Sequence, residues 1–154
     1  MSGLKDLVGQ SSQPYRFVVE EGKIAEFVRA VGATHPLFRD REAAVAAGLR
    51  GILAPPTFVA ASAHWAPRDG GLSLGLDVKR VLAGGGEWQY FQPVCAGDEL
   101  TVTMHVESVK EKQGSRGPME IMRVRTDFER DGELVQVYSN DIIQFAPLGG
   151  EKTA

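Results

Sequence analysis

The spacing of apolar residues changes along the chain, from a helical period in its first third to a two-residue period in its last third. Four apolar residues recur at i, i+3, i+4 and i+7: Ile24, Phe27, Val28 and Val31. They predict an amphipathic helix that ends at Gly32 and follows a short strand over residues 15–19.

Two further helices are predicted before the glycine-rich middle of the chain. Asp40 is a suitable N-cap for a short helix that Gly48 can end in the left-handed conformation. Residues 55–65 are small or apolar at nearly every position, and proline stands at a helix start. A helix here is expected to be enclosed by the protein rather than to lie on its surface.

The two-residue period indicates long strands after residue 98. Leu100, Val102, Met104 and Val106 alternate with polar residues, which is typical of a half-buried strand. Similar alternation over residues 122–129, an Asp-Gly turn, and the run 134–145 predict two antiparallel neighbours. The glycines at 84–86 are expected at the entry to another strand, residues 87–91.

These elements predict an α+β fold in one domain, residues 1–154, with an antiparallel sheet and helices on one face. Such a sheet has an open edge. Because an unpaired edge invites pairing with another chain, we expect a dimer rather than a monomer.

The composition excludes several classes of function. With 17 Lys+Arg against 20 Asp+Glu, the net charge of -3 lacks the basic surplus of nucleic-acid-binding proteins. One cysteine and three histidines exclude a disulfide framework within the chain and a Cys/His zinc site, so no metal is expected. The N-terminus carries no signal peptide or membrane span, and a cytoplasmic location is expected.

Few side chains stand in a catalytic context. His35 lies in a loop between two predicted helices. No carboxylate closely precedes it, and Asp40, which follows together with Glu42, already has a capping role, so a structural role is favoured. His64 is expected in the interior and His105 on the polar side of its strand. The serines lack the Gly-x-Ser-x-Gly setting of a hydrolase nucleophile, and the glycine run lacks the residues of a nucleotide-binding loop.

Several segments resemble the MaoC-like dehydratases, which have the hot-dog fold, an antiparallel sheet wrapped around a central buried helix. The segments are residues 27–38, 43–48, 52–58, 85–94 and 96–100. Active (3R)-specific hydratases of that family carry Gly-Asp-x-Asn-Pro-Leu/Ile-His, whose aspartate and histidine bind the water that adds to an enoyl thioester.

On this chain the catalytic aspartate of that motif falls on Ala33, the asparagine on His35 and the histidine on Phe38. A methyl group and a phenyl ring cannot transfer a proton. The glycine whose N–H polarises the thioester carbonyl falls on Pro56, which has no N–H. The resemblance thus implies no catalytic residue.

A scaffold without the dyad resembles the FAS1-like (MaoC N-terminal) dehydratase domain. In heterodimeric (3R)-hydroxyacyl-thioester dehydratases that half holds the acyl chain and a second hot-dog subunit supplies the dyad. The resemblance implies an acyl-CoA or acyl-ACP ligand, a catalytic MaoC-like partner and no cofactor. The residues expected to line the acyl tunnel are Phe38, Leu53, Pro55, Thr57, Phe58 and Ala61. For any single one of them, ordinary core packing is the favoured role.

Three alternatives remain open. A self-sufficient homodimeric hydratase would use His35 with Asp40 or Glu42 in place of the dyad. An acyl-CoA thioesterase would share the fold but need a carboxylate aimed at the thioester carbonyl. A pure acyl-CoA-binding module would show no turnover. The sequence specifies neither the acyl chain nor the choice between CoA and acyl-carrier protein.

Overall fold

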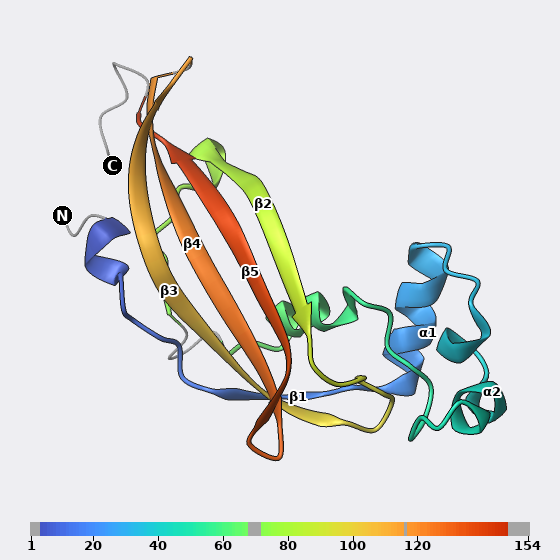
Figure 1. Ribbon diagram of the computed structural model, residues 1–154. Coiled ribbons are helices and arrows are strands. Elements are labelled where there is room, and N and C mark those ends of the chain that lie inside the picture. Colours follow the sequence, from blue (N-terminus) through green and yellow to red (C-terminus); the bar gives the residue numbers. More distant parts are fainter. Residues whose placement is uncertain (1–3, 68–71, 116, 148–154) are drawn as a thin grey trace.

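Five antiparallel strands form one sheet in the computed structural model, which describes residues 4–67, 72–115 and 117–147 (Figure 1). The strands are β1 (Tyr15–Val18), β2 (Val81–Tyr90), β3 (Glu99–Gly114), β4 (Gly117–Arg130) and β5 (Glu133–Phe145). The α-helices are α1 (Glu21–Ala30) and α2 (Arg41–Ala46). The 3₁₀ helices are η1 (Leu4–Leu7), η2 (Pro36–Phe38), η3 (Phe58–His64) and η4 (Val78–Arg80). The expected single domain, residues 1–154, extends beyond the described ranges at both ends.

The strand order is β1-β3-β4-β5-β2, and the three long neighbours predicted from the sequence are β3, β4 and β5. The turn between β4 and β5 uses Asp131 and Gly132 at φ 54° and 82°. Two successive residues with positive φ match the twist of the strands that they join. The predicted Asp-Gly turn is therefore confirmed.

The glycine run lies inside β2 instead of at its entry, because β2 begins at Val81. The pairing of β2 with β5 is irregular between Ala83 and Gly86. A Cβ on Gly84 would stand 2.9 Å from the carbonyl oxygen of Asp141 on β5. The glycine allows the two backbones to approach closely, a role that the sequence prediction missed.

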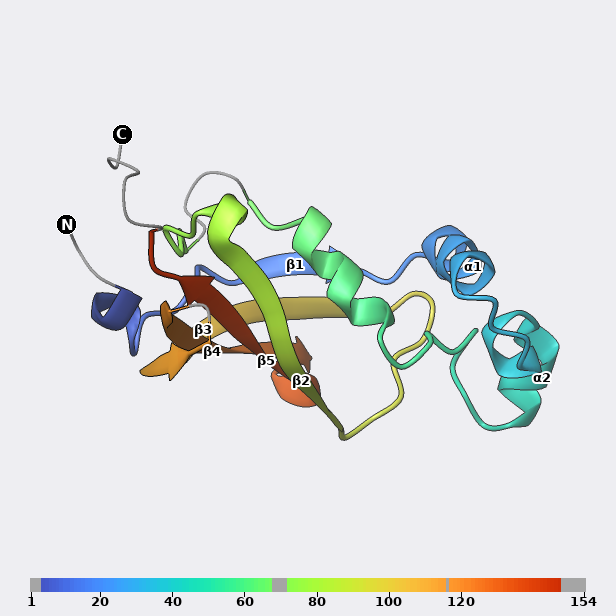
Figure 2. The same ribbon diagram turned by 90° about the horizontal axis from the view of Figure 1, so that it is seen from above.

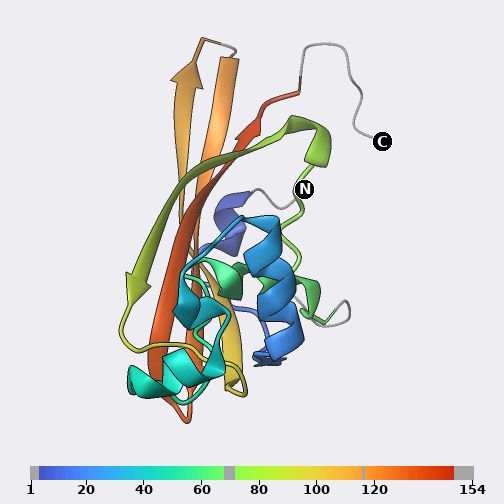
Figure 3. The same ribbon diagram turned by 90° about the vertical axis from the view of Figure 1, so that its right-hand side faces the viewer.

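Helices α1, α2 and η3 all lie on one side of the sheet (Figures 2 and 3). Helix α1 buries Ile24 and Val28 of its predicted apolar stripe. The Oδ1 atom of Asp40 accepts hydrogen bonds from the backbone N–H groups of Glu42 and Ala43, at 2.8 and 3.2 Å. Gly48 follows α2 with φ 82°, so both predicted ends of this helix are confirmed.

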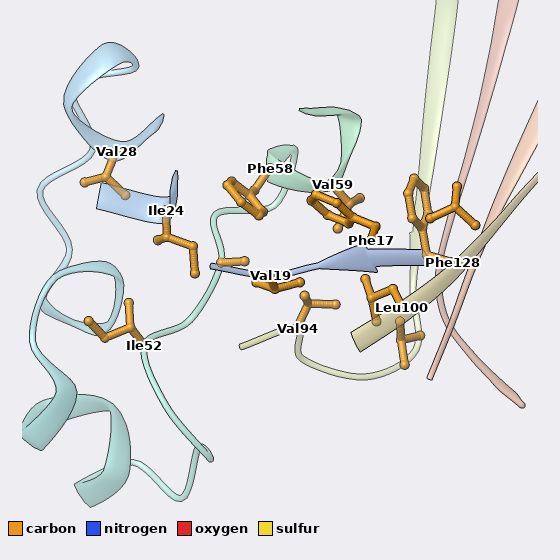
Figure 4. Close-up of a cluster of buried hydrophobic side chains, with 13 residues drawn as sticks. Phe17, Val19, Ile24, Val28, Ile52, Phe58, Val59, Val94, Leu100 and Phe128 are labelled. Atoms are coloured by element: carbon orange, nitrogen blue, oxygen red, sulfur yellow. The ribbon is translucent and has the colours of Figure 1, made fainter. Parts of the chain in front are cut away.

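The main core lies between η3 and the part of the sheet that contains β1 (Figure 4). The Phe58 ring of η3 packs 6.0 Å from Phe17 of β1 and 5.6 Å from Phe27 of α1, measured between centroids. Phe128 of β4 closes the cluster from the sheet, and Phe17, Phe58 and Phe128 are each 1% exposed. Aromatic contacts thus attach the helices to the sheet.

The segment predicted as an enclosed helix is a 3₁₀ helix that starts at Phe58, later than expected. Phe58, Val59 and Ser62 are buried, whereas Ala60 and Ala63 are exposed in the single chain. His64, expected in the interior, is exposed as well. Apolar composition on every side predicts burial, but one sheet can cover only one side of a helix.

Strand β2 forms one edge of the sheet, so the backbone groups on its outer side have no neighbouring strand in the described part of the chain. Large apolar side chains near this edge are exposed, among them Leu82 at 49%, Tyr90 at 50% and Phe91 at 55%. None of the described helices is long and apolar enough to cross a lipid bilayer.

Candidate functional site

A cavity of about 360 Å³ opens at the end of β2, within the size range of roughly 300–1,000 Å³ that is usual for small-molecule sites. Its walls come from Phe38 of η2, residues 53, 54 and 56, the segment 90–94, and Gln136 of β5. Most of these side chains are apolar or aromatic. The cavity is thus suited to an apolar ligand.

Backbone hydrogen bonds bring these distant segments together. The N–H of Leu53 donates to the carbonyl of Leu37 at 2.9 Å, and the N–H of Ala54 donates to the carbonyl of Val94 at 2.8 Å. The segment that contains the two prolines is therefore held between η2 and the loop after β2. As a result, Phe38 and Pro56 line the same cavity although they are far apart in the sequence.

The cavity has no proton-transfer group at the positions that the resemblance singled out. The Phe38 ring lines it, and Ala33 packs against the adjacent core cluster. Pro56 lines it as well and has no N–H to donate. Among the described residues that line the cavity, none is Asp, Glu or His.

His35 and Asp40, the alternative catalytic pair, are both exposed and engaged locally. The Nδ1 atom of His35 accepts a hydrogen bond from the N–H of Leu37 at 3.3 Å, and its ring lies 5.7 Å from that of Phe38. Asp40 caps α2. These contacts do not join the imidazole to the carboxylate, and use of His35 in catalysis stays a prediction.

The structure places the expected acyl-binding residues in different surroundings. Leu53 lines the cavity together with Phe38. Pro55 is buried, Thr57 is exposed and Ala61 is half-buried. Phe58 belongs to the main core. Their contact with an acyl chain stays a prediction.

A buried carboxylate that the sequence prediction missed supports one wall of the cavity. Asp98, 7% exposed, accepts hydrogen bonds from Arg50 at 2.7 and 3.0 Å, from Arg130 at 3.0 Å and from the N–H of Cys95 at 2.9 Å. Arg130 also donates to the carbonyl of Pro93 at 3.1 Å and to Gln92. Asp98 thereby fixes the loop that forms this wall.

Gln136 and Tyr90 supply polar atoms at the cavity. Gln136 is only 4% exposed, and its Oε1 atom has no hydrogen-bond partner among the described residues. Partial burial raises the pKa of the Tyr90 hydroxyl, which keeps it neutral. A glutamine between two buried valines was the available signal in the sequence, but its role depends on the neighbouring strands.

A serine, a histidine and an aspartate meet on the sheet face opposite the helices, away from the cavity. The Oγ atom of Ser11 lies 2.7 Å from Nδ1 of His105, and Nε2 of His105 lies 3.5 Å from Oδ2 of Asp127. Arg125 donates to the other oxygen of Asp127 at 2.6 Å. Because this arginine neutralises the carboxylate, the group is best interpreted as a polar cross-strand contact.

The comparisons with known proteins agree with this architecture. Residues 6–137 match the family "FAS1-like, dehydratase domain region". A UPF0336 protein of Streptomyces griseus is 42% identical over 137 residues, which cover 85% of this chain and 87% of that protein. Two of the similar solved structures are complexes from Mycobacterium tuberculosis.

The first is a C-terminally truncated HadBC (3R-hydroxyacyl-ACP dehydratase) complex, with a TM-score of 0.77, 31% identity, and coverage of 90% of this chain and 97% of the matched one. The second is the ChsH1-ChsH2 complex, with a TM-score of 0.74, 26% identity, and coverage of 96% and 89%. The expected α+β hot-dog fold is thereby confirmed. The chain belongs to the family of FAS1-like, MaoC-like dehydratase domains.

Proposed function

We propose that this chain is the acyl-thioester-binding, non-catalytic subunit of a (3R)-specific enoyl-thioester hydratase or 3-hydroxyacyl-thioester dehydratase. One observation carries the proposal: Phe38 and Pro56 line the same cavity. On the family pattern, these are the positions of the catalytic histidine and of the N–H that polarises the thioester carbonyl. These two positions, which would have to cooperate in catalysis, therefore share one cavity and are chemically inert.

The rate contributions of the missing catalytic groups are large enough that turnover by this cavity alone would be negligible. A positioned acid or base contributes about 10²–10⁴-fold to a rate. One donor to a developing oxyanion contributes about 10²–10³-fold. The chain lacks the aspartate, the histidine and the donor together, at Ala33, Phe38 and Pro56. What remains is an apolar cavity, which can hold an acyl chain while another subunit performs the proton transfers.

The partner is proposed to be a catalytic hot-dog subunit. Strand β2 presents an unpaired edge, and exposed apolar side chains such as Leu82 and Phe91 flank it. Burial of these side chains against a second sheet would stabilise the assembly. HadBC and ChsH1-ChsH2, the similar structures, are themselves complexes. A homodimer along the same edge is the alternative, and the cytoplasmic location belongs to the same proposal.

The test is reconstitution. The full chain is purified alone and together with a small MaoC-like chain that carries an intact Gly-Asp-x-Asn-Pro-x-His motif. Hydration of crotonyl-CoA, followed by its absorbance, is expected only in the mixture. His35→Ala should leave the activity of the mixture unchanged, because His35 is exposed and lies outside the cavity lining.

Three results would contradict the proposal. Hydration by the chain alone that His35→Ala abolishes would identify a self-sufficient enzyme. Release of free CoA from acyl-CoA by the chain alone would identify a thioesterase. Tight acyl-CoA binding without turnover in any mixture would leave only a binding module.

A further inference from the structure

Gln136 places an acceptor atom, Oε1, that has no partner among the described residues in a mostly apolar cavity. It pairs directly with Phe128 of β4 and with Tyr90 of β2. Directly opposite residues of antiparallel strands point to the same face, and Phe128 lies in the core on the helix side. Gln136 therefore points to the helix side of the sheet, where it lines the cavity.

The position of Gln136 within the cavity is deep. It is 4% exposed, similar to Ala54 at 4% and Val94 at 1%, whereas Tyr90 and Phe91 are at least half exposed. The two aromatic side chains thus stand at the mouth of the cavity, and Gln136 stands at its floor. The far end of an acyl chain that enters at the mouth would therefore contact the carboxamide of Gln136.

An unpartnered buried acceptor is costly, because the group has lost its hydrogen bonds to water without replacing them. Leucine or methionine would fill similar space in this core without that cost. A ligand that donates a hydrogen bond to Oε1 would therefore explain why a carboxamide is present at this position. The volume of about 360 Å³ far exceeds the space that a single water molecule needs.

We propose that the cavity selects an acyl chain that carries a hydroxyl at its far end, and that Gln136 recognises this hydroxyl. The inference rests on the proposed function and names its substrate class: a thioester of an acyl chain with a terminal hydroxyl. The large charged carrier, whether CoA or acyl-carrier protein, cannot enter an apolar cavity, so the thioester stays at the mouth.

A hydroxyl is the group that fits best. It donates to the amide oxygen and can also accept from the amide nitrogen, so it matches either orientation of the carboxamide. An acyl chain that ended in a carboxylate would bury a negative charge without a cation beside it, because none of the described residues that line the cavity is Lys or Arg. A plain alkyl end would leave Oε1 of Gln136 without a partner.

The experiment compares matched ligands by isothermal titration calorimetry. The full chain, alone and in complex with its catalytic partner, is titrated with hexanoyl-, octanoyl- and decanoyl-CoA and with the terminally hydroxylated derivative of each. We expect the hydroxylated member of at least one pair to bind about tenfold more tightly, equivalent to about 1.4 kcal/mol. Gln136→Leu is expected to abolish this preference while it retains binding of the plain chain.

Two further variants serve as controls. Gln89→Leu changes an exposed glutamine on the neighbouring strand β2, outside the cavity lining, and should keep the preference. Gln136→Met is close in size to glutamine and provides a second test if the leucine variant unfolds. Thermal melting followed by circular dichroism establishes that each variant is folded.

The outcomes separate the two proposals. Equal binding of both members of every pair overturns this inference and leaves acyl binding intact, as expected if a water molecule or a partner side chain satisfies Oε1. A preference that persists in Gln136→Leu overturns it as well. If neither member of any pair binds in either form of the protein, both the inference and the proposed function are wrong.

Discussion

Replacement of Asp98 by alanine is expected to lower the free energy of unfolding by about 3–5 kcal/mol, the usual cost of breaking a buried ion pair. The carboxylate is 7% exposed and the side chain of its partner Arg130 is 13% exposed. Removal of Asp98 leaves the charge of Arg130 largely buried and unpaired. It also removes the acceptor for the N–H of Cys95.

The second arginine provides a matched control. Arg50 binds the same carboxylate, but its side chain is 55% exposed. An exposed ion pair contributes only about 0–1 kcal/mol, because water and salt screen it. Arg50→Ala should therefore cost much less than Asp98→Ala, although both remove contacts to one carboxylate.

Urea denaturation measures these differences directly, and calorimetry gives the melting temperature. For a domain of this size, each kcal/mol lowers the melting temperature by about 2–4 °C. Asp98→Ala should also weaken acyl-CoA binding, because Arg130 fixes Gln92 and Pro93 in the cavity wall. Equal costs for Asp98→Ala and Arg50→Ala would refute the reasoning, since burial would then not decide the strength of the pair.

Three other changes test the fold. Phe58→Ala should lower the free energy of unfolding by about 3–5 kcal/mol in urea denaturation, because the ring is 1% exposed in the main core; a cost below 1 kcal/mol would contradict this packing. Gly84→Ala should lower the melting temperature because its Cβ would clash with the β5 backbone at 2.9 Å, whereas Gly85→Ala, with its nearest contact at 3.8 Å, should be tolerated; equal effects would refute the close approach. Hydrogen bonds from Arg80 and Arg16 lower the pKa values of Asp77 and Glu99. Since these carboxylates have lower pKa values when folded, their contribution to stability is present above the ordinary values near pH 4 and is lost as the pH falls through the lowered ones. Denaturation at a series of pH values should show a shallower acid loss for the Asp77→Asn, Glu99→Gln double variant, and an unchanged slope would contradict it.

Local patterns predicted the elements that depend on local physics. The apolar stripe of α1 and the alternation in β3 each identify one face of one element, and a periodic segment reports its own buried face. Asp40 caps α2 because the acceptor and donors lie within three residues of one another. The family motifs are also local, and they placed Ala33 and Phe38 at the positions of the dyad.

Features that depend on distant contacts were missed. The sequence indicated an apolar segment at residues 55–65 but not which side of η3 the sheet would cover. The sequence prediction placed the glycine run at the entry to a strand. The contact that explains Gly84 is with Asp141 on another strand, and a local pattern does not reveal it. Asp98 and Arg130 are likewise separated by 32 positions, and no local pattern relates them.

The sequence by itself determined the family, the order and type of most elements, and the absence of acid and base groups from the motif. Each of these depends on residues that are close together in the sequence. Only the tertiary structure decided that Phe38, Pro56 and Gln136 share one cavity. That arrangement comes from strand pairing and from backbone hydrogen bonds such as that between Ala54 and Val94. Such contacts join residues far apart in the chain, so the polarity of the cavity depends on how the strands align rather than on any one segment.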